Sequence, residues 1–367
     1  MKKLLLTFLV GLLSLPAFAA DSDDFEYTYE GQTLTYTIIS EADKTVKTKD
    51  GSNTMAGTFA GNSVTGALIL PEKVQYNSSE YTLTEIGYHA FYECSGLTSI
   101  EIPNSVTTIG IKAFIYCTGL TSVTIPASVT YIGVNAFFGC TKLGNVYFNA
   151  KNCTNDYFVE NSGAYLTFPT TVSNFVFGDE VTKIPEGILL ANEKIQSINI
   201  PESVTEIGNY AFGWTSALKE IVLPNSVKTI GELAFYTSVS LETVQVGSSV
   251  TKIDDYAFEN CKNLSSITCY AVEPPVCGQM VFEGIDTSNC QLNVPENSIE
   301  LYASTAPWSD FLNIKAASIK DIINDIADEN VAVYNMQGVC LGIFHRNDLT
   351  SLASGLYIVG GKKALVK

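Results

Sequence analysis

The chain has 367 residues, of which 46% are hydrophobic, and its formal net charge is −17. A chain of this length and composition can bury a sizeable core, which excludes an intrinsically disordered protein and leaves room for two or three domains. The acidic balance argues against nucleic acid or an anionic membrane surface as a partner, because both attract positive charge.

The first twenty residues have the features of a secretory signal peptide. Lys2 and Lys3 precede an apolar run over positions 4–15, and the sequence AFA at 17–19 gives a small-x-small cleavage pattern. We therefore predict that residues 1–20 are a signal peptide and that the mature chain lies at the cell surface or outside the cell, with the periplasm as the alternative. No later run is long and apolar enough to span a bilayer, so we expect no integral membrane span after signal removal.

A repeat of 23 residues occupies most of the chain. The text TSIEIPNSVTTIGIKAF, which begins at Thr98, returns as TSVTIPASVTYIGVNAF at Thr121, and the spacing is kept throughout except for one step of 29 residues between Phe148 and Phe177. A fixed period in this range is typical of a solenoid, whose coils bury their apolar faces only against one another.

Each coil follows the same physical pattern. The alternation Ile100-Glu101-Ile102 predicts a half-buried strand that ends at a proline, and a second short strand and a glycine follow it. The glycine permits a tight turn where a side chain would clash. After it comes a phenylalanine that we expect to stack continuously inside the rod, with Leu189 in the coil that lacks one. The phenylalanines of this expected stack are Phe91, Phe114, Phe137, Phe212, Phe235 and Phe258.

Seven of the nine cysteines fall into two groups. Three residues after each phenylalanine stands a small side chain that can make one hydrogen bond: Cys94, Cys117, Cys140, Thr215, Ser238 and Cys261. Because Thr and Ser share this position, we predict structural free thiols there. Cys269, Cys277 and Cys290 lie off the column, where a disulfide is plausible but the pairing cannot be deduced.

No catalytic constellation is evident. The two histidines, His89 and His345, are interpreted as solvated surface residues, and no serine or cysteine has a plausible histidine base in a neighbouring coil. Metal-ligand spacings and phosphate-binding loops are also missing from the sequence. We therefore predict a protein that is not an enzyme and has no cofactor, metal or catalytic residues.

The variable outward positions are the candidates for partner binding. Strand positions predicted to face outward on one sheet supply Glu101, Thr124, Tyr147, Asn199, Glu220 and Gln245. The 29-residue coil adds the aromatic residues Tyr157, Phe158, Tyr165 and Phe168 in an irregular loop. Aromatic side chains mark protein hot spots and sugar-stacking sites. The alternative is that the polar positions are merely tolerated by a solvated sheet and that the aromatics fill the core of the enlarged coil.

The segment LTSIEIPNSVTTIGIKAFIYC, beginning at Leu97, resembles the BspA-like leucine-rich-repeat proteins exported by Bacteroidetes. The resemblance covers about residues 68–314. It implies a β-rich leucine-rich-repeat solenoid with parallel strands and short helical turns over 68–315, an N-terminal β-hairpin cap over 21–67, and a closing coil sealed by Trp308 and Phe311. For some members of the family it also implies adhesion to host matrix proteins.

The C-terminal segment no longer follows the 23-residue repeat. Residues 316–330 are expected to form a linker, and 331–367 a small C-terminal β module that resembles the back half of type IX secretion sorting domains, with an accessory β module as the alternative. The leading functional hypothesis is a surface protein that binds a protein ligand, such as a host matrix or cell-surface protein. Two others remain open: a glycan-binding accessory module of a carbohydrate-uptake system, and a structural envelope protein.

Overall fold

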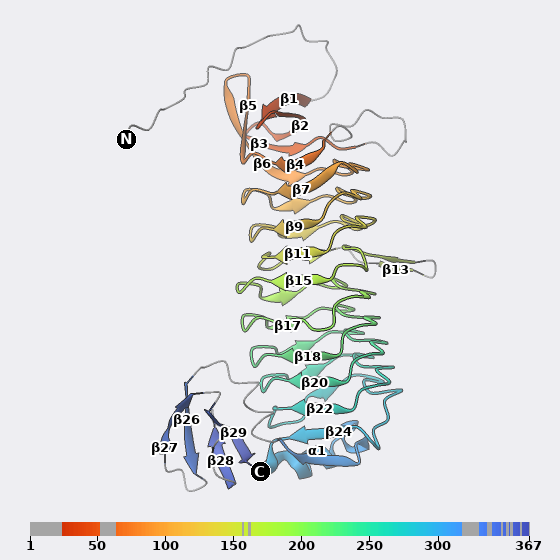
Figure 1. Ribbon diagram of the computed structural model, residues 1–367, viewed down its shortest axis with the longest axis vertical. Helices are drawn as coiled ribbons and strands as arrows, with labels where there is room; N and C mark the ends of the chain where they lie inside the picture. The colour runs from red at the N-terminus through yellow and green to blue at the C-terminus, as the bar shows by residue number, and fades with distance from the viewer. Residues whose placement is uncertain are drawn as a thin grey trace.

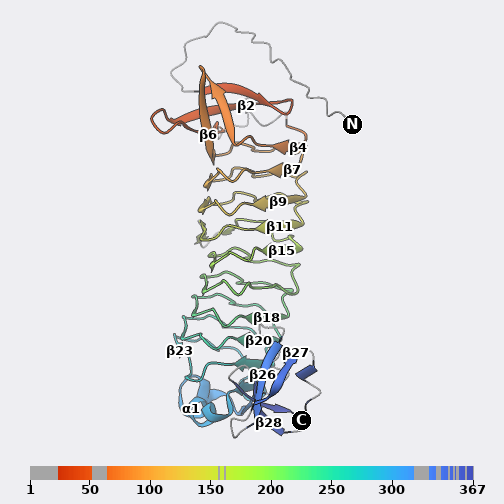
Figure 2. The same cartoon turned by 90° about the vertical axis from the view of Figure 1, so that its left-hand side faces the viewer.

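The computed structural model describes residues 24–51, 64–155, 158–160, 163–317, 330–335, 340–345, 348–349, 352, 355–359 and 362–366. The protein is a rod of stacked coils, with a β-sheet at its N-terminal end and a small separate sheet beside its C-terminal end (Figures 1 and 2). The predicted signal peptide, residues 1–20, lies outside the described residues. Each coil has three sides, which we call the first, second and third walls.

The first wall is a parallel sheet made by the first strand of each coil. Its alternation of buried and exposed positions places the apolar side chains inside, as in β11 with Val146 and Phe148 buried. Its N-terminal part has the order β15-β11-β9-β7-β4 and its C-terminal part β18-β20-β22-β24-β25, and one bridge, Asn199 to Val222, lies at the break. The strands are β4 (Gly66–Ile69), β7 (Leu97–Glu101), β9 (Ser122–Ile125), β11 (Asn145–Phe148), β15 (Asn174–Phe177), β18 (Glu220–Leu223), β20 (Thr243–Val246), β22 (Ser266–Cys269), β24 (Gln291–Val294) and β25 (Asn313–Ala316).

The second wall is a narrower parallel sheet, mostly of two-residue strands. These are β6 (Ser79–Ile86), β8 (Thr108–Ile109), β10 (Tyr131–Ile132) and β12 (Thr154–Asn155), then β16 (Lys183–Ile184), β17 (Glu206–Ile207), β19 (Thr229–Ile230), β21 (Lys252–Ile253) and β23 (Val276–Cys277). At the N-terminal end, β1 (Asp24–Tyr29), β2 (Gln32–Ser40) and β3 (Thr45–Thr48) continue this sheet, with β3 parallel to β6, and β5 (Lys73–Tyr76) pairs antiparallel with β6. These strands cover the edge that the first coil would otherwise expose to pairing with another chain.

The third wall consists of turns rather than strands, and it is hydrogen-bonded between coils as well. The amide of Phe114 donates to the carbonyl of Ala136 at 2.8 Å, and Tyr116 donates to Phe138 at 2.8 Å. Two residues per turn have positive φ, for example Lys112 at 55° and Tyr116 at 60°. The preceding glycine is needed for close approach, because a Cβ on Gly110 would lie 2.8 Å from the backbone of the previous coil. The expected side-chain clash is thus confirmed.

The phenylalanine stack forms in two halves. Rings of Phe91, Phe114 and Phe137 follow one another at centroid distances of 5.1 and 5.0 Å, and Phe168 continues the stack at 5.0 Å. For Phe168, the core-filling alternative is therefore correct, since only 3% of it is exposed. Leu189 separates this half from the second one, so the prediction of a continuous stack of rings is wrong. The second half contains Phe212, Phe235, Phe258 and Phe282. At its end, Trp308 and Phe311 pack edge-on against Phe282.

The cysteine column has the role that the sequence predicts. The thiol of Cys117 donates to the carbonyl of Phe91 in the preceding coil at 3.0 Å, and the Ser238 hydroxyl makes the same bond to Phe212 at 2.9 Å. Cys269, Cys277 and Cys290 form no disulfide, so the pairing considered for this group does not occur.

Two further β elements extend from the rod. The hairpin of β13 (Phe158–Glu160) and β14 (Gly163–Tyr165) projects sideways from the enlarged coil (Figure 1). Near the C-terminal end, 3-10 turns at Glu296–Ser298 and Trp308–Asp310 flank the short helix α1 (Ile299–Ser304). The small C-terminal sheet is confirmed as an antiparallel unit of order β27-β26-β28-β29. Its strands are β26 (Asn330–Asn335), β27 (Cys340–His345), β28 (Gly355–Val359) and β29 (Lys362–Val366).

Candidate partner-binding surface

One outward column on the first wall carries large side chains in register. Thr124 pairs with Tyr147, and Tyr147 pairs with Val176 on the next parallel strand. Tyr147 and Val176 are each 43% exposed, and Ile69 and Val222 of the same column are exposed to a similar degree. Because strand side chains alternate between the two faces of a sheet, these residues point away from the core on a rigid support. We call the column from Ile69 to Val222 the outer column.

A neighbouring column is polar. The amide of Asn174 donates to the side-chain oxygen of Asn145 at 3.1 Å, and further along the rod Glu220 lies in register with Thr243. The predicted residue Glu220 therefore belongs to a different column from Glu101, Thr124 and Tyr147. Amides and carboxylates beside exposed apolar side chains give this wall both contact area and hydrogen-bonding groups.

The open surface ends before the C-terminal coils. Gln245 is half-buried, and Thr268, which the sequence places on the same outward column, is only 4% exposed. The Asn293 amide lies 3.3 Å from the hydroxyls of both Ser266 and Thr268, so it covers part of the sheet there. Of the predicted residues, Glu101, Thr124, Tyr147 and Asn199 are exposed on this wall, whereas Gln245 lies at its closing end.

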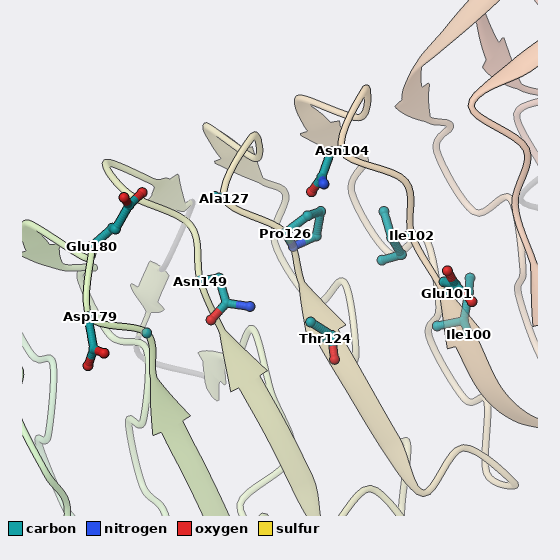
Figure 3. A pocket seen from close by; sticks show the side chains of 11 residues that line it. Ile100, Glu101, Ile102, Asn104, Thr124, Pro126, Ala127, Asn149, Asp179 and Glu180 are labelled. Carbon is teal, nitrogen blue, oxygen red and sulfur yellow. The ribbon is translucent and has the colours of Figure 1, made fainter.

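A groove of about 630 Å³ runs along the end of this wall, where the strands turn into the second wall (Figure 3). Its floor is apolar, with Ile100, Ile102 and Pro126 buried, and its rim is polar, with Glu101 and Thr124. The groove therefore shares two predicted residues with the first wall.

The far side of the groove is acidic. Asp179 and Glu180 lie across from Glu101, with Asn149 between the two sides (Figure 3). Lys151 lies 3.2 Å from Glu180 and compensates part of this charge. Sequence reasoning missed Asn149, Asp179 and Glu180 because they follow the strands, and the polar candidates for partner binding were taken from strand positions alone.

The hairpin residues leave the rod from a different wall. Phe158 and Tyr165 are paired across β13 and β14, and the chain enters this hairpin after β12 of the second wall. Tyr147, by contrast, lies on the first wall. Tyr157 lies outside the described residues. A contribution of Tyr157, Phe158 and Tyr165 to partner binding stays a prediction.

The third wall carries aromatic clusters that sequence reasoning missed. Trp214 and Tyr236 meet edge-on at 4.9 Å, and Tyr210 lies nearly parallel to Trp214 at 6.0 Å. In an earlier coil, His89 is 5% exposed and stacks on Tyr88 at 4.1 Å, so its interpretation as a solvated residue is wrong. Gly51 packs against His89, since a Cβ added at Gly51 would lie 2.8 Å from the His89 Cβ, and the ring stacks on both Tyr88 and Tyr92. Comparing the outward turn positions between coils, in addition to the inward phenylalanine and cysteine columns, would have revealed these clusters.

The described residues contain no group of three or more His, Cys, Asp or Glu side chains that could hold a metal ion. Within the same part of the chain, no helix has the length and apolar character needed to cross a membrane.

Comparison with known proteins supports the repeat assignment. The BspA type leucine-rich repeat region matches in six copies over residues 71–188 and 182–305. A search of curated proteins found no match. Among solved structures, a leucine-rich cell surface protein from Faecalibacterium prausnitzii is 20% identical, with 84% of this chain and 99% of that chain covered and a TM-score of 0.43.

Two other solved structures of leucine-rich-repeat proteins are also similar to this chain. The leucine-rich-repeat protein of T. pallidum is 23% identical over 70% of this chain and 88% of that one, with a TM-score of 0.33. A leucine-rich-repeat protein from Bacteroides ovatus is 21% identical over 82% of this chain and all of that one (100%), with a TM-score of 0.30.

Proposed function

Because this chain belongs to the BspA-type leucine-rich-repeat family, we propose that it is an exported surface protein that binds a macromolecular ligand through its first wall. The leading ligand class is a protein, such as a host matrix or cell-surface protein, and the role is adhesion. Export rests on the signal-like residues 1–20.

The observation that carries this proposal is the outer column. A solvated parallel sheet needs only small polar side chains on its outside, as at Thr124, yet Tyr147, Val176 and Val222 are large and exposed. Repeat solenoids use such extended faces for broad partners, and contiguous exposed apolar side chains mark interaction sites. The groove at the end of the wall adds acidic and amide groups beside the same surface.

The test is binding of the mature protein to arrays of matrix proteins and polysaccharides. A double variant, Tyr147→Ser with Val176→Thr, removes the apolar contact area, and the matched control is Val276→Thr, which changes a side chain that is 72% exposed on the second wall. We expect saturable binding to a protein that the double variant loses and the control retains. Loss in both variants, or loss explained by a lower melting temperature, contradicts the assignment of the site.

Binding to polysaccharide alone would instead favour the glycan-binding hypothesis. If the protein bound neither array and light scattering showed self-association, the hypothesis of a structural envelope protein would be favoured.

The C-terminal sheet supports a separate proposal, a role in sorting during secretion. Its strands pair only with one another in the described residues, so it can act as a unit attached to the rod. Deleting residues 331–367 should leave the rod folded and keep the protein from reaching the cell surface. Normal surface display of the truncated chain would contradict this role.

A further inference from the structure

The third wall carries an aromatic cluster whose members come from two adjacent coils. Backbone bonds hold these coils together at the cluster: Tyr210 donates to the carbonyl of Glu232 at 2.9 Å, and Trp214 donates to the carbonyl of Tyr236 at 2.7 Å. The three rings are partly exposed, and they meet at 4.9 and 6.0 Å. Rigid turns therefore present three aromatic rings and one carboxylate side by side. We call these four residues the aromatic platform.

The scaffold does not demand these aromatic side chains. Trp214 has a φ of 55°, and the same position in other coils also has positive φ but holds Glu93, Tyr116, Ala191, Thr237 or Asn260. The backbone conformation is thus a property of the repeat, while the indole is particular to this coil.

Charge on this wall changes from one half of the rod to the other. The position after the turn glycine is Tyr88, Ile111 or Val134 in the first coils, but Glu232 and Asp255 in the later ones. The turns at 208–215, 231–238 and 254–261 contain no lysine or arginine. Glu232 is exposed and takes part in none of the ion pairs of the described residues. Burial and the nearby Glu232 carboxylate both raise the pKa of Tyr210.

Aromatic faces beside a carboxylate are complementary to an organic cation. The ring quadrupole attracts a guanidinium or ammonium group within about 6 Å of the ring centroid, and Trp is the best of the aromatic acceptors. A carboxylate adds a charge-assisted hydrogen bond. A neutral sugar could stack on the rings and donate hydroxyl hydrogen bonds to a carboxylate, but it would gain no charge–charge attraction from the acidic positions along this wall.

We propose that the aromatic platform of Tyr210, Trp214, Tyr236 and Glu232 is a second binding site, which takes an arginine or lysine side chain from an extended basic segment of a protein. It goes beyond the first-wall function, because it lies on another wall and recognises a different chemistry. The acidic positions Asp255 and Glu259 in the following coil extend the site toward the next basic residues of such a segment.

The chain supplies its own matched control. Tyr116 and Phe138 meet at 5.9 Å and 69° in the same turn columns and are tied by the same type of backbone bond. There, however, Lys112 and Val134 stand at the positions of Tyr210 and Glu232. This pair offers similar rings without the carboxylate and with a competing cation.

The test titrates the full mature chain into a fluorescein-labelled, end-capped Gly-Arg-Gly-Arg-Gly-Arg-Gly peptide and follows anisotropy at low salt. We expect Trp214→Ala to weaken binding roughly 3- to 30-fold and Glu232→Gln to weaken it as well, whereas Tyr116→Ala leaves it unchanged. Alanine is native to the Trp214 column at Ala191, which has a φ of 57°, so the variant should fold. Unchanged thermal melting would verify this.

Three results would overturn the proposal. These are equal binding of a peptide with glutamine in place of arginine, equal loss in the Trp214→Ala and Tyr116→Ala variants, and binding of a neutral oligosaccharide in preference to the basic peptide. The first-wall double variant, Tyr147→Ser with Val176→Thr, is tested separately for binding of its protein ligand and of the basic peptide. If it loses its protein ligand while the peptide still binds, the two sites are independent, and failure of one assignment leaves the other standing.

Discussion

Replacing Phe114 with alanine tests the stacking of the coils. This side chain is fully buried, and its ring is stacked on both sides, on Phe91 at 5.1 Å and 2° and on Phe137 at 5.0 Å and 9°. Truncating a buried phenylalanine to alanine costs about 3–5 kcal/mol, and each lost ring pair accounts for about 0.5–1.5 kcal/mol of packing beyond area burial. With both faces of the ring in contact, we expect a loss of about 4–5 kcal/mol.

The loss should spread to both neighbouring coils. In a solenoid, stability is approximately a sum of terms for each repeat and each interface, and Phe114 contributes to two interfaces. Urea unfolding gives the total change, and native-state hydrogen exchange shows where protection falls. We expect faster exchange at the amides of Phe91 and Phe114, which donate to the carbonyls of Ala113 and Ala136 in the following coils.

Phe114→Leu is the matched control, because Leu189 occupies this column in another coil. We expect it to cost well under half as much as the alanine variant. A cost below about 1 kcal/mol for alanine, or lost protection confined to one coil, would refute the idea that the stack couples the coils.

Three further changes test the scaffold. Cys117→Ser should change stability less than Cys117→Val does, because serine keeps the bond to the Phe91 carbonyl. Cys117→Val should cost about 0.5–1.5 kcal/mol, because that carbonyl loses this bond and keeps the one from the Cys94 amide at 3.2 Å; equal urea midpoints would contradict this. Gly110→Ala should cost about 1–3 kcal/mol through backbone overlap with the previous coil, and an unchanged melting temperature would argue against the close approach. Burial raises the pKa of Cys261 to about 12, so the thiol stays neutral in the folded chain while it ionises near pH 8.5 when unfolded. Stability should therefore fall as pH rises from about 8.5 toward 12, by about 2 kcal/mol up to pH 10, and urea midpoints of Cys261→Ser should fall less steeply.

The 23-residue period was sufficient to predict the parallel solenoid and most of its core. Strand alternation assigns Val146 and Phe148 to the inside without any tertiary information. The shared Cys, Ser and Thr column identifies a hydrogen-bonding position, as the Cys117 bond confirms. Both inferences succeed because each coil repeats the same local environment.

Other features depend on contacts that the period does not encode. The hairpin inserted in the enlarged coil shifts the spacing, so Phe168 was not recognised as the residue stacked on Phe137. His89 was misjudged because the N-terminal segment covers it: the Gly51 amide donates to the Tyr88 carbonyl at 2.6 Å, and Gly51 lies against His89. The aromatic platform joins residues 22 and 26 positions apart, which only the register of the turns brings together.

The repeated geometry of the coils supports a first wall that we propose binds a ligand. A binding isotherm of a captured protein ligand against the wild type, the Tyr147→Ser with Val176→Thr variant and the Val276→Thr control, all with matched melting temperatures, tests this assignment. We expect only the double variant to lose affinity, by about tenfold or more. Identical isotherms for all three proteins would contradict it and move the ligand site to another wall.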